Sequence, residues 1–160
     1  MEEWHDLFVA AAGASAALMG LIFVGVSINL TRILSIPTLP GPALISLVLL
    51  LTIMIESLML LIPHESITVS GAGILLIGFI VWVTIVVFDI SIFRKKDNQY
   101  KKPYLLNIFL NQFATVPYFI AGIVMINGNL YGLYWFASAM LFSFFKASFD
   151  AWVLLVEINR

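Results

Sequence analysis

The sequence predicts an all-α protein, a polytopic transmembrane helix bundle of five spans with the N-terminus out and the C-terminus in. Of its 160 residues, 62% are hydrophobic and 11% are charged, and the mean hydropathy is +1.06. Soluble domains are about half apolar and about a quarter charged. Polar and turn-forming residues separate five apolar segments, each close to the roughly 20 residues that cross a bilayer. We expect one transmembrane domain over residues 1–160, because the loops are too short to hold a second.

The expected spans are 7–34, 43–62, 71–93, 104–126 and 131–158. The stretch IPTLPGP at 36–42 ends the first span, because its prolines remove amide donors and fix φ. Residues 63–70, the charged loop RKKDNQYKK at 94–102 and the NGN turn at 127–129 separate the others. The segment 104–126 contains the most polar interruptions, so a four-span alternative with this segment re-entrant or interfacial stays open. Five spans are favoured, because four would place Arg160 outside.

The basic residues predict the orientation, because lysine and arginine favour short cytoplasmic loops. With the loop 94–102 inside, Arg32 and Arg160 also fall inside, and the acidic start MEEWHD falls outside. Lys146, within the fifth span, is the exception among the eight basic residues. An acidic start is unlike the basic n-region of a signal peptide, so we expect the first helix to be retained as a membrane span.

Small residues follow one face of the first span at steps of three and four: Ala10, Gly13, Ala17, Gly20, Val24, Ser27 and Thr31. Helices in lipid associate by close backbone approach, which small residues permit. We expect the part from Ala10 to Gly20 to be a packing seam, and the part from Ser27 to Thr31 to border polar residues of other spans. Whether this face packs on a neighbouring helix or lines a pore stays open.

Ionisable side chains inside a bilayer cost roughly 3 kcal/mol each and are functional candidates by default. Four fall well inside the expected spans: Glu56, Asp89, Lys146 and Asp150. Lys146 and Asp150 are four apart and share one helix face. With a rise of about 1.5 Å per residue, Asp150 lies on the order of 10 Å from the inner end of its helix. Asp89, Asn107 and Asn111 lie at a similar depth, so we expect a polar layer in the inner half.

Two interpretations of this layer stay open. It is either a hydrated vestibule or an ion or proton site, in which Lys146 is the counter-ion of Asp89 and Asp150, or a network that fixes helix packing. A buried pair that is neutral overall often contributes no more than packing specificity. Contact with lipid headgroups is a third possibility.

Glu56 stands in the outer third of the second span, and no cation in that segment matches it. We expect it to be protonated in place, to face an outer aqueous mouth, or to be reached by His5 or His64. In an oligomer, a ring of such glutamates would favour cations. In the fourth span Pro117 frees a carbonyl near mid-membrane, which is typical of transporter sites but equally of plain packing kinks.

Several function classes lack support. The chain has no cysteine and a net charge of −1, which argues against disulfides, thiolate metal sites and nucleic-acid partners. Its two histidines show no metal-ligand spacing, and no nucleophile–base pair or phosphate-binding loop is visible. We expect neither an enzyme nor a metal or cofactor site.

The first helix reads W at position 4, LF at 7–8, GASAAL at 13–18, GLIFV at 20–24 and SINL at 27–30. This pattern resembles the opening of a group of small bacterial multi-span membrane proteins to which no function is attached. The resemblance covers about the first 30 residues. It implies a bacterial cell-membrane location and carries over no functional residue.

We expect a homo-oligomeric, channel-like or transport-like protein for a small ion or solute. A five-helix bundle has a limited interior, and the small seam of the first helix suggests that the bundle completes itself against another subunit. The alternative is a non-conducting adaptor that binds membrane lipids or another membrane protein, with the buried charges acting only in packing.

Overall fold

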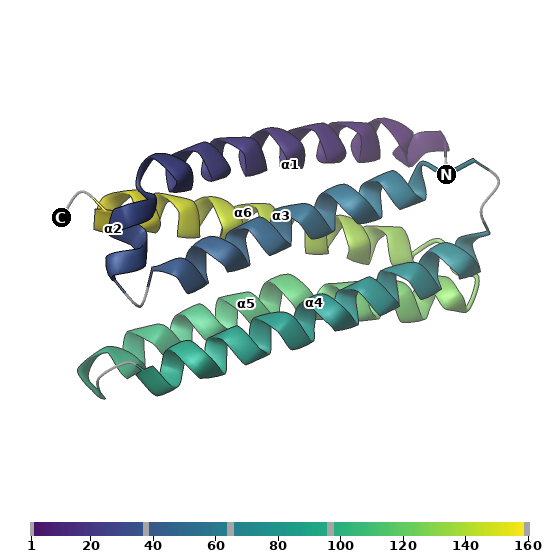
Figure 1. Cartoon of the computed structure of the whole chain (residues 1–160). Helices are drawn as coiled ribbons and strands as arrows, with labels where there is room; N and C mark the ends of the chain where they lie inside the picture. The colour runs from purple at the N-terminus through teal and green to yellow at the C-terminus, as the bar shows by residue number, and fades with distance from the viewer. Residues whose placement is uncertain (1, 37–38, 64–65, 96–97, 159–160) are drawn as a thin grey trace.

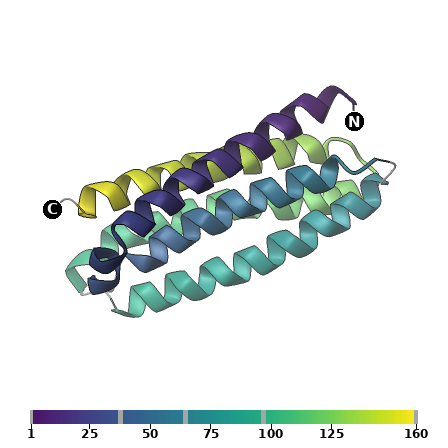
Figure 2. The ribbon, with the colours of Figure 1, turned by 45° about the horizontal axis from the view of Figure 1, so that its top comes forward.

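The computed structural model describes residues 2–36, 39–63, 66–95 and 98–158, and these form helices and short connections. The helices are α1 (Glu2–Ile28), α2 (Leu30–Ser35), α3 (Pro40–Leu60), α4 (Ile67–Lys95), α5 (Asn98–Ile126) and α6 (Gly132–Ile158). All except α2 are long and apolar enough to cross a membrane, which confirms the all-α class and the five segments of membrane-spanning length. Consecutive long helices run in opposite directions (Figures 1 and 2). We call the end where α1 begins the N-terminal end of the bundle, and the end where α6 ends the C-terminal end.

Helix α3 lies at the centre of the bundle. It packs against α1, α4 and α6, whereas α5 packs against α4 and α6, and α1 touches α6 only slightly. The core therefore lies between α3, α4, α5 and α6. Its fully buried side chains include Leu49, Ile53 and Tyr118. Helix α5 is continuous across Pro117, and its segment Tyr104–Ile126 is one of the five segments long and apolar enough to span.

Most helices begin or end a few residues away from the expected span limits, and two of these differences have a local cause. The first span was expected to continue to residue 34, but α1 ends at Ile28, and the short α2 follows Asn29. The Asn29 side chain donates to the carbonyl of Gly25 at 3.0 Å. Asparagine competes in this way with backbone hydrogen bonds and so favours helix ends. Helix α3 begins at Pro40, earlier than expected, because proline in the first helical turn loses no hydrogen bond.

The backbones of α4 and α5 approach each other closely at two glycines. A Cβ atom added to Gly71 would lie 2.7 Å from the backbone nitrogen of Ile126, and one added to Gly122 would lie 3.0 Å from the carbonyl oxygen of Gly71. Any side chain at either position would push the two helices apart. These two glycines therefore permit the contact that aligns α4 with α5.

The predicted seam of α1 points away from the rest of the chain. Ala10, Gly13, Ala17, Gly20 and Ser27 are exposed, and a Cβ atom at either glycine would meet nothing within 4 Å. The opposite face of α1 packs inward instead, through the buried Phe8, Ala11, Ala12 and Ser15. Within one chain the seam is not a packing surface, so contact with a neighbouring protein stays a prediction.

Candidate functional site

A carboxylate from α4 is held by two side chains of α5 near the C-terminal end of the bundle. Asp89 accepts a hydrogen bond from the Tyr104 hydroxyl at 3.0 Å. The Asn111 amide nitrogen donates to both of its carboxylate oxygens, at 2.9 and 3.0 Å. All three side chains are buried. Asp89 is thus bound by neutral donors, and not by the lysine that the sequence suggested as its counter-ion.

An ion pair from α6 lies on the other side of Asn111. The Lys146 ammonium donates to Asp150 one helical turn away, and both residues are almost fully buried. Helix residues four apart face the same side, so the pair forms within α6 without help from another helix. Lys146 also interacts electrostatically with Asp89. The expected pairing with Asp150 is present, whereas the link to Asp89 is an interaction at longer range.

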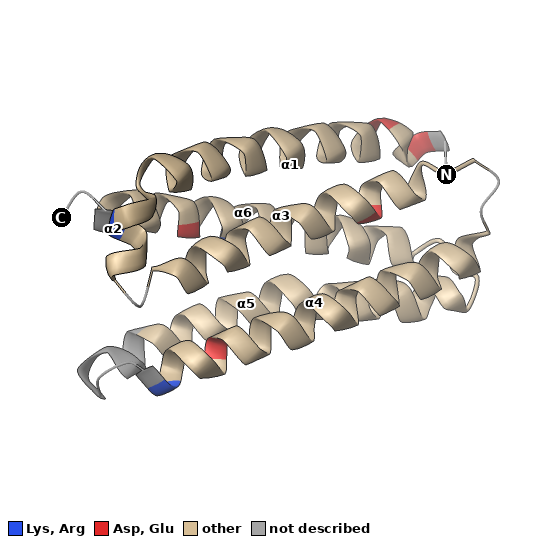
Figure 3. Cartoon of the chain, viewed as in Figure 1, with Lys and Arg blue, Asp and Glu red and all other residues tan. Residues whose placement is uncertain are grey.

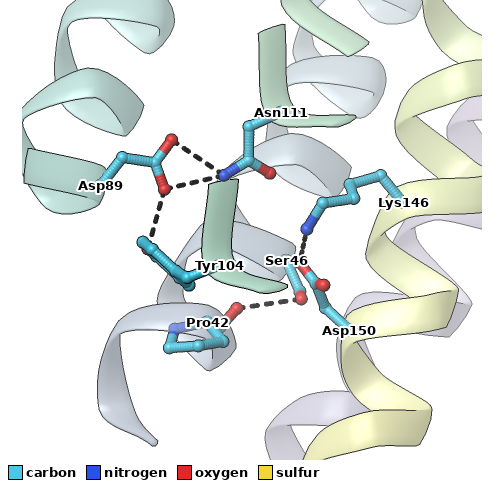
Figure 4. Close-up of polar contacts among 7 residues, drawn as sticks. All are labelled: Pro42, Ser46, Asp89, Tyr104, Asn111, Lys146 and Asp150. Carbon is cyan, nitrogen blue, oxygen red and sulfur yellow. Dashed lines mark hydrogen bonds and ion pairs between the residues drawn. The ribbon is translucent and has the colours of Figure 1, made fainter. Parts of the chain in front are cut away.

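Asn111 stands between these two halves (Figure 4). Its amide nitrogen donates to Asp89, but its side-chain oxygen Oδ1 is buried without a hydrogen-bond partner among the described residues. A buried acceptor left without a donor costs about 1–3 kcal/mol. We call Asp89, Tyr104, Asn111, Lys146 and Asp150 the charged cluster.

The charged cluster contains two carboxyl groups, Asp89 and Asp150, and one ammonium group, Lys146. With these three groups ionised, the charged cluster carries one excess negative charge. An unbalanced buried charge is costly in a low-dielectric interior. A proton or a monovalent cation would complete the balance. Among the described residues, no group of three or more His, Asp or Glu side chains gathers as a potential metal site.

Glu56 lies toward the N-terminal end of the bundle, away from the charged cluster. It is fully buried, and neither of its carboxyl oxygens has a hydrogen-bond partner among the described residues. It interacts electrostatically with Tyr118, whose hydroxyl lies 3.3 Å from the Ser143 hydroxyl. Ser143 in turn lies 3.3 Å from the carbonyl oxygen of Ala114. We call Glu56, Tyr118 and Ser143 the Glu56 cluster.

The burial of Glu56 contradicts two of the expectations for this residue. It does not face an aqueous mouth, and it lies inside its own chain, so it cannot contribute to a ring of glutamates around a shared pore. His64 lies outside the described residues, and His5 is exposed on the surface.

Helix periodicity connects the two clusters. Tyr104, Asn111 and Tyr118 follow one another at steps of seven along α5, and Ser143, Lys146 and Asp150 follow at steps of three and four along α6. Both spacings return to the same helix face. The two faces meet because α5 packs against α6. The charged cluster and the Glu56 cluster therefore follow one another along the bundle axis, and we call the two together the buried polar file.

Two cavities border the charged cluster. One of about 260 Å³ lies between α5, α6 and the start of α3, and its wall includes Tyr104, Asn107 and Asp150. The other, of about 210 Å³, lies between α4 and α5, and its wall includes Asp89 and Arg94. Each buried carboxylate of the cluster therefore lies beside its own recess near the C-terminal end.

The residues of the predicted polar layer meet only in part. Four of them, Asp89, Asn111, Lys146 and Asp150, lie together, and Asn107 lines the neighbouring cavity. Ser27, at the inner end of the first helix, is exposed instead of bordering the layer.

Tyr104 was not among the residues expected in the polar layer, although it donates a hydrogen bond to Asp89. A signal was available: Tyr104 and Asn111 are seven apart, so they share one face of the helix.

Comparison with protein-family models, with curated proteins and with solved structures gave no match to this chain. The functional argument therefore rests on the geometry of the site.

Proposed function

We propose that this multi-pass membrane protein moves a small cation, most simply a proton, along the buried polar file within each chain. The observation that carries the proposal is an imbalance among the described residues, where three carboxyl groups, Glu56, Asp89 and Asp150, and one ammonium group, Lys146, are buried. Intramembrane ionisable residues are costly and mark ion and proton paths. Proton transfer between neighbouring side chains does not require a wide water-filled channel.

The cavities support an entry point at the C-terminal end. Asp150 and Asp89 each border a recess there, so a cation has a short route to the charged cluster. From Lys146 the next polar group along α6 is Ser143, whose hydroxyl lies 3.3 Å from that of Tyr118. Tyr118 in turn interacts electrostatically with Glu56. This order gives the path a direction along the bundle axis.

The distribution of surface charge supports an orientation with the N-terminus outside the cell membrane and the C-terminus inside. Arg32 lies in α2 and Arg94 near the end of α4, both toward the C-terminal end, whereas Glu3 and Asp6 lie in the first turns of α1. Figure 3 shows basic residues at the end of the bundle opposite the N-terminus. Arginine and lysine favour the cytoplasmic side. Because the chain lacks cysteine, single substitutions Asp6→Cys and Arg94→Cys test this orientation. A membrane-impermeant maleimide should label the first but not the second in intact cells, and the reverse pattern would overturn the orientation.

Flux measurements in proteoliposomes test the proposed transport. A potassium diffusion potential set with valinomycin should drive wild-type proton uptake that a pH-sensitive dye inside the vesicles reports. Asp150→Asn and Glu56→Gln remove a titratable group with little change of shape, and each should lower the flux at least tenfold. Asp6→Asn, at an exposed position, is the matched control and should leave the flux unchanged. Wild-type flux equal to that of empty vesicles, or equal flux in all variants, would refute the proposal.

The second candidate is a membrane adaptor that binds another membrane protein or a second copy of the chain. It is favoured by the exposed small face of α1, which contacts nothing in the chain at Gly13 and Gly20. In this case the triple substitution Lys146→Met, Asp89→Leu and Asp150→Leu should leave assembly intact. Chemical cross-linking in mild detergent measures that assembly. Loss of the cross-linked species in the triple variant would contradict the adaptor candidate, in which the charges act only in packing.

A further inference from the structure

A cavity at the N-terminal end of the bundle belongs to neither cluster. It has a volume of about 540 Å³ and lies between the start of α1 and the turn that joins α5 to α6. Its wall consists of Glu3, Trp4, Gly128, Asn129, Leu130, Tyr131 and Tyr134. Sites for small molecules commonly have volumes of about 300–1,000 Å³, so its size suits a small organic ligand.

Three aromatic rings and one carboxylate give the cavity its chemistry. The rings of Trp4 and Tyr134 meet edge to face with centroids 4.8 Å apart, and the ring of Tyr131 lies 6.1 Å from that of Tyr134. Aromatic faces carry partial negative charge and attract cations within about 6 Å. Glu3 adds a full negative charge to the same wall. The cavity therefore favours a cation that also has apolar surface.

The wall is held in place from both sides. Trp4 stacks on the buried Phe8 at 6.3 Å, and Phe8 meets the buried Phe136 at 5.9 Å. On the turn, the Asn129 side-chain oxygen accepts a hydrogen bond from the backbone nitrogen of Tyr131 at 2.9 Å. Ordered walls lower the entropic cost of binding.

We propose that this cavity binds an organic ammonium cation, such as a trimethylammonium group, between the rings of Trp4, Tyr131 and Tyr134 and the carboxylate of Glu3. An ammonium group with methyl substituents presents both charge and apolar surface, which matches the wall. The site does not depend on the proposed transport, because binding at the N-terminal end needs no passage along the polar file. The cation arrives either free in solution or as the headgroup of a choline lipid.

Binding is measured with choline as the probe on the full chain in nanodiscs made of phosphatidylglycerol, by isothermal titration calorimetry. The neutral isostere 3,3-dimethyl-1-butanol has the same shape without the charge. Choline should bind at least fivefold more tightly than the isostere. Glu3→Gln and Trp4→Leu should each weaken choline binding by about tenfold, in line with a desolvated cation–π contact and a lost charge.

Matched controls separate the site from a general aromatic belt. Asp6→Asn removes an exposed carboxylate outside the cavity, and Trp135→Leu removes an exposed ring outside it. Both should leave choline affinity unchanged. Equal binding of choline and its isostere, or an affinity unaffected by Glu3→Gln and Trp4→Leu, would overturn the proposal.

Nanodiscs made of phosphatidylcholine distinguish the two sources of the cation. If lipid headgroups occupy the cavity, added choline should bind at least fivefold more weakly there than in phosphatidylglycerol. If the ligand is a free cation, the two affinities should agree. Either result supports the site, provided that binding in phosphatidylglycerol shows the preference for charge.

Discussion

Replacing Lys146 with methionine leaves the Asp150 carboxylate buried without its partner. Asp150 is 6% exposed and Lys146 1% exposed, so neither group is compensated by bulk water. Removing one member of a buried ion pair costs about 3–5 kcal/mol, whereas replacing both with apolar residues is close to neutral or stabilising. We therefore expect Lys146→Met to lower the free energy of unfolding by about 3–5 kcal/mol. The double variant Lys146→Met, Asp150→Leu should lie within about 1 kcal/mol of wild type or above it.

Reversible unfolding by titration of sodium dodecyl sulfate into mixed micelles measures these free energies, with tryptophan fluorescence as the signal. The control Asp6→Asn changes an exposed carboxylate and should shift the free energy by no more than about 0.5 kcal/mol. A cost below about 1 kcal/mol for Lys146→Met would refute the reasoning. It would mean that water in the cavity beside Asp150 solvates the carboxylate as well as the ammonium does.

Two further predictions concern helix contact and the hydrogen bonds of Asp89. Gly71→Ala places a Cβ atom 2.7 Å from the backbone of α5 and should destabilise the bundle by about 1–3 kcal/mol in the same unfolding assay. Gly13→Ala meets nothing within 4 Å and should be neutral or stabilising by up to about 1 kcal/mol, so equal costs for the two would contradict the packing. Tyr104→Phe removes one donor to Asp89 and should cost about 1.5–3 kcal/mol. Tyr131→Phe, at a tyrosine that is 71% exposed, should leave the stability unchanged, and a similar loss there would count against that assignment.

Much of the candidate site was predictable because depth in a membrane follows from position along a helix. Counting residues from the ends of the spans placed Asp89, Asn111, Lys146 and Asp150 at one level, and the structure brings these four together. The same count could not say which groups bond. Which side chains form hydrogen bonds depends on how each helix is rotated about its own axis. In the structure the orientations of α4 and α5 bring Asn111 and Tyr104 to Asp89.

The small face of α1 shows where sequence reasoning reached its limit. In a soluble helix the apolar stripe faces the core, so the pattern predicts which side is buried. In a membrane helix both sides are apolar, and small residues mark only a surface that permits close contact. Gly71 and Gly122 use that property inside the chain, whereas Gly13 and Gly20 face outward.

The sequence by itself determined the class of the protein and the five segments of membrane-spanning length, because both follow from local hydropathy and segment length. It also determined that Lys146 and Asp150 share a face, since this is a property of one helix. Only the tertiary structure decided that Glu56 is buried without a partner among the described residues. Only the tertiary structure also decided that Trp4 and Tyr131, which are far apart in the sequence, line one cavity. Such features depend on how helices that are distant in the sequence pack against each other, and no local sequence pattern specifies this packing.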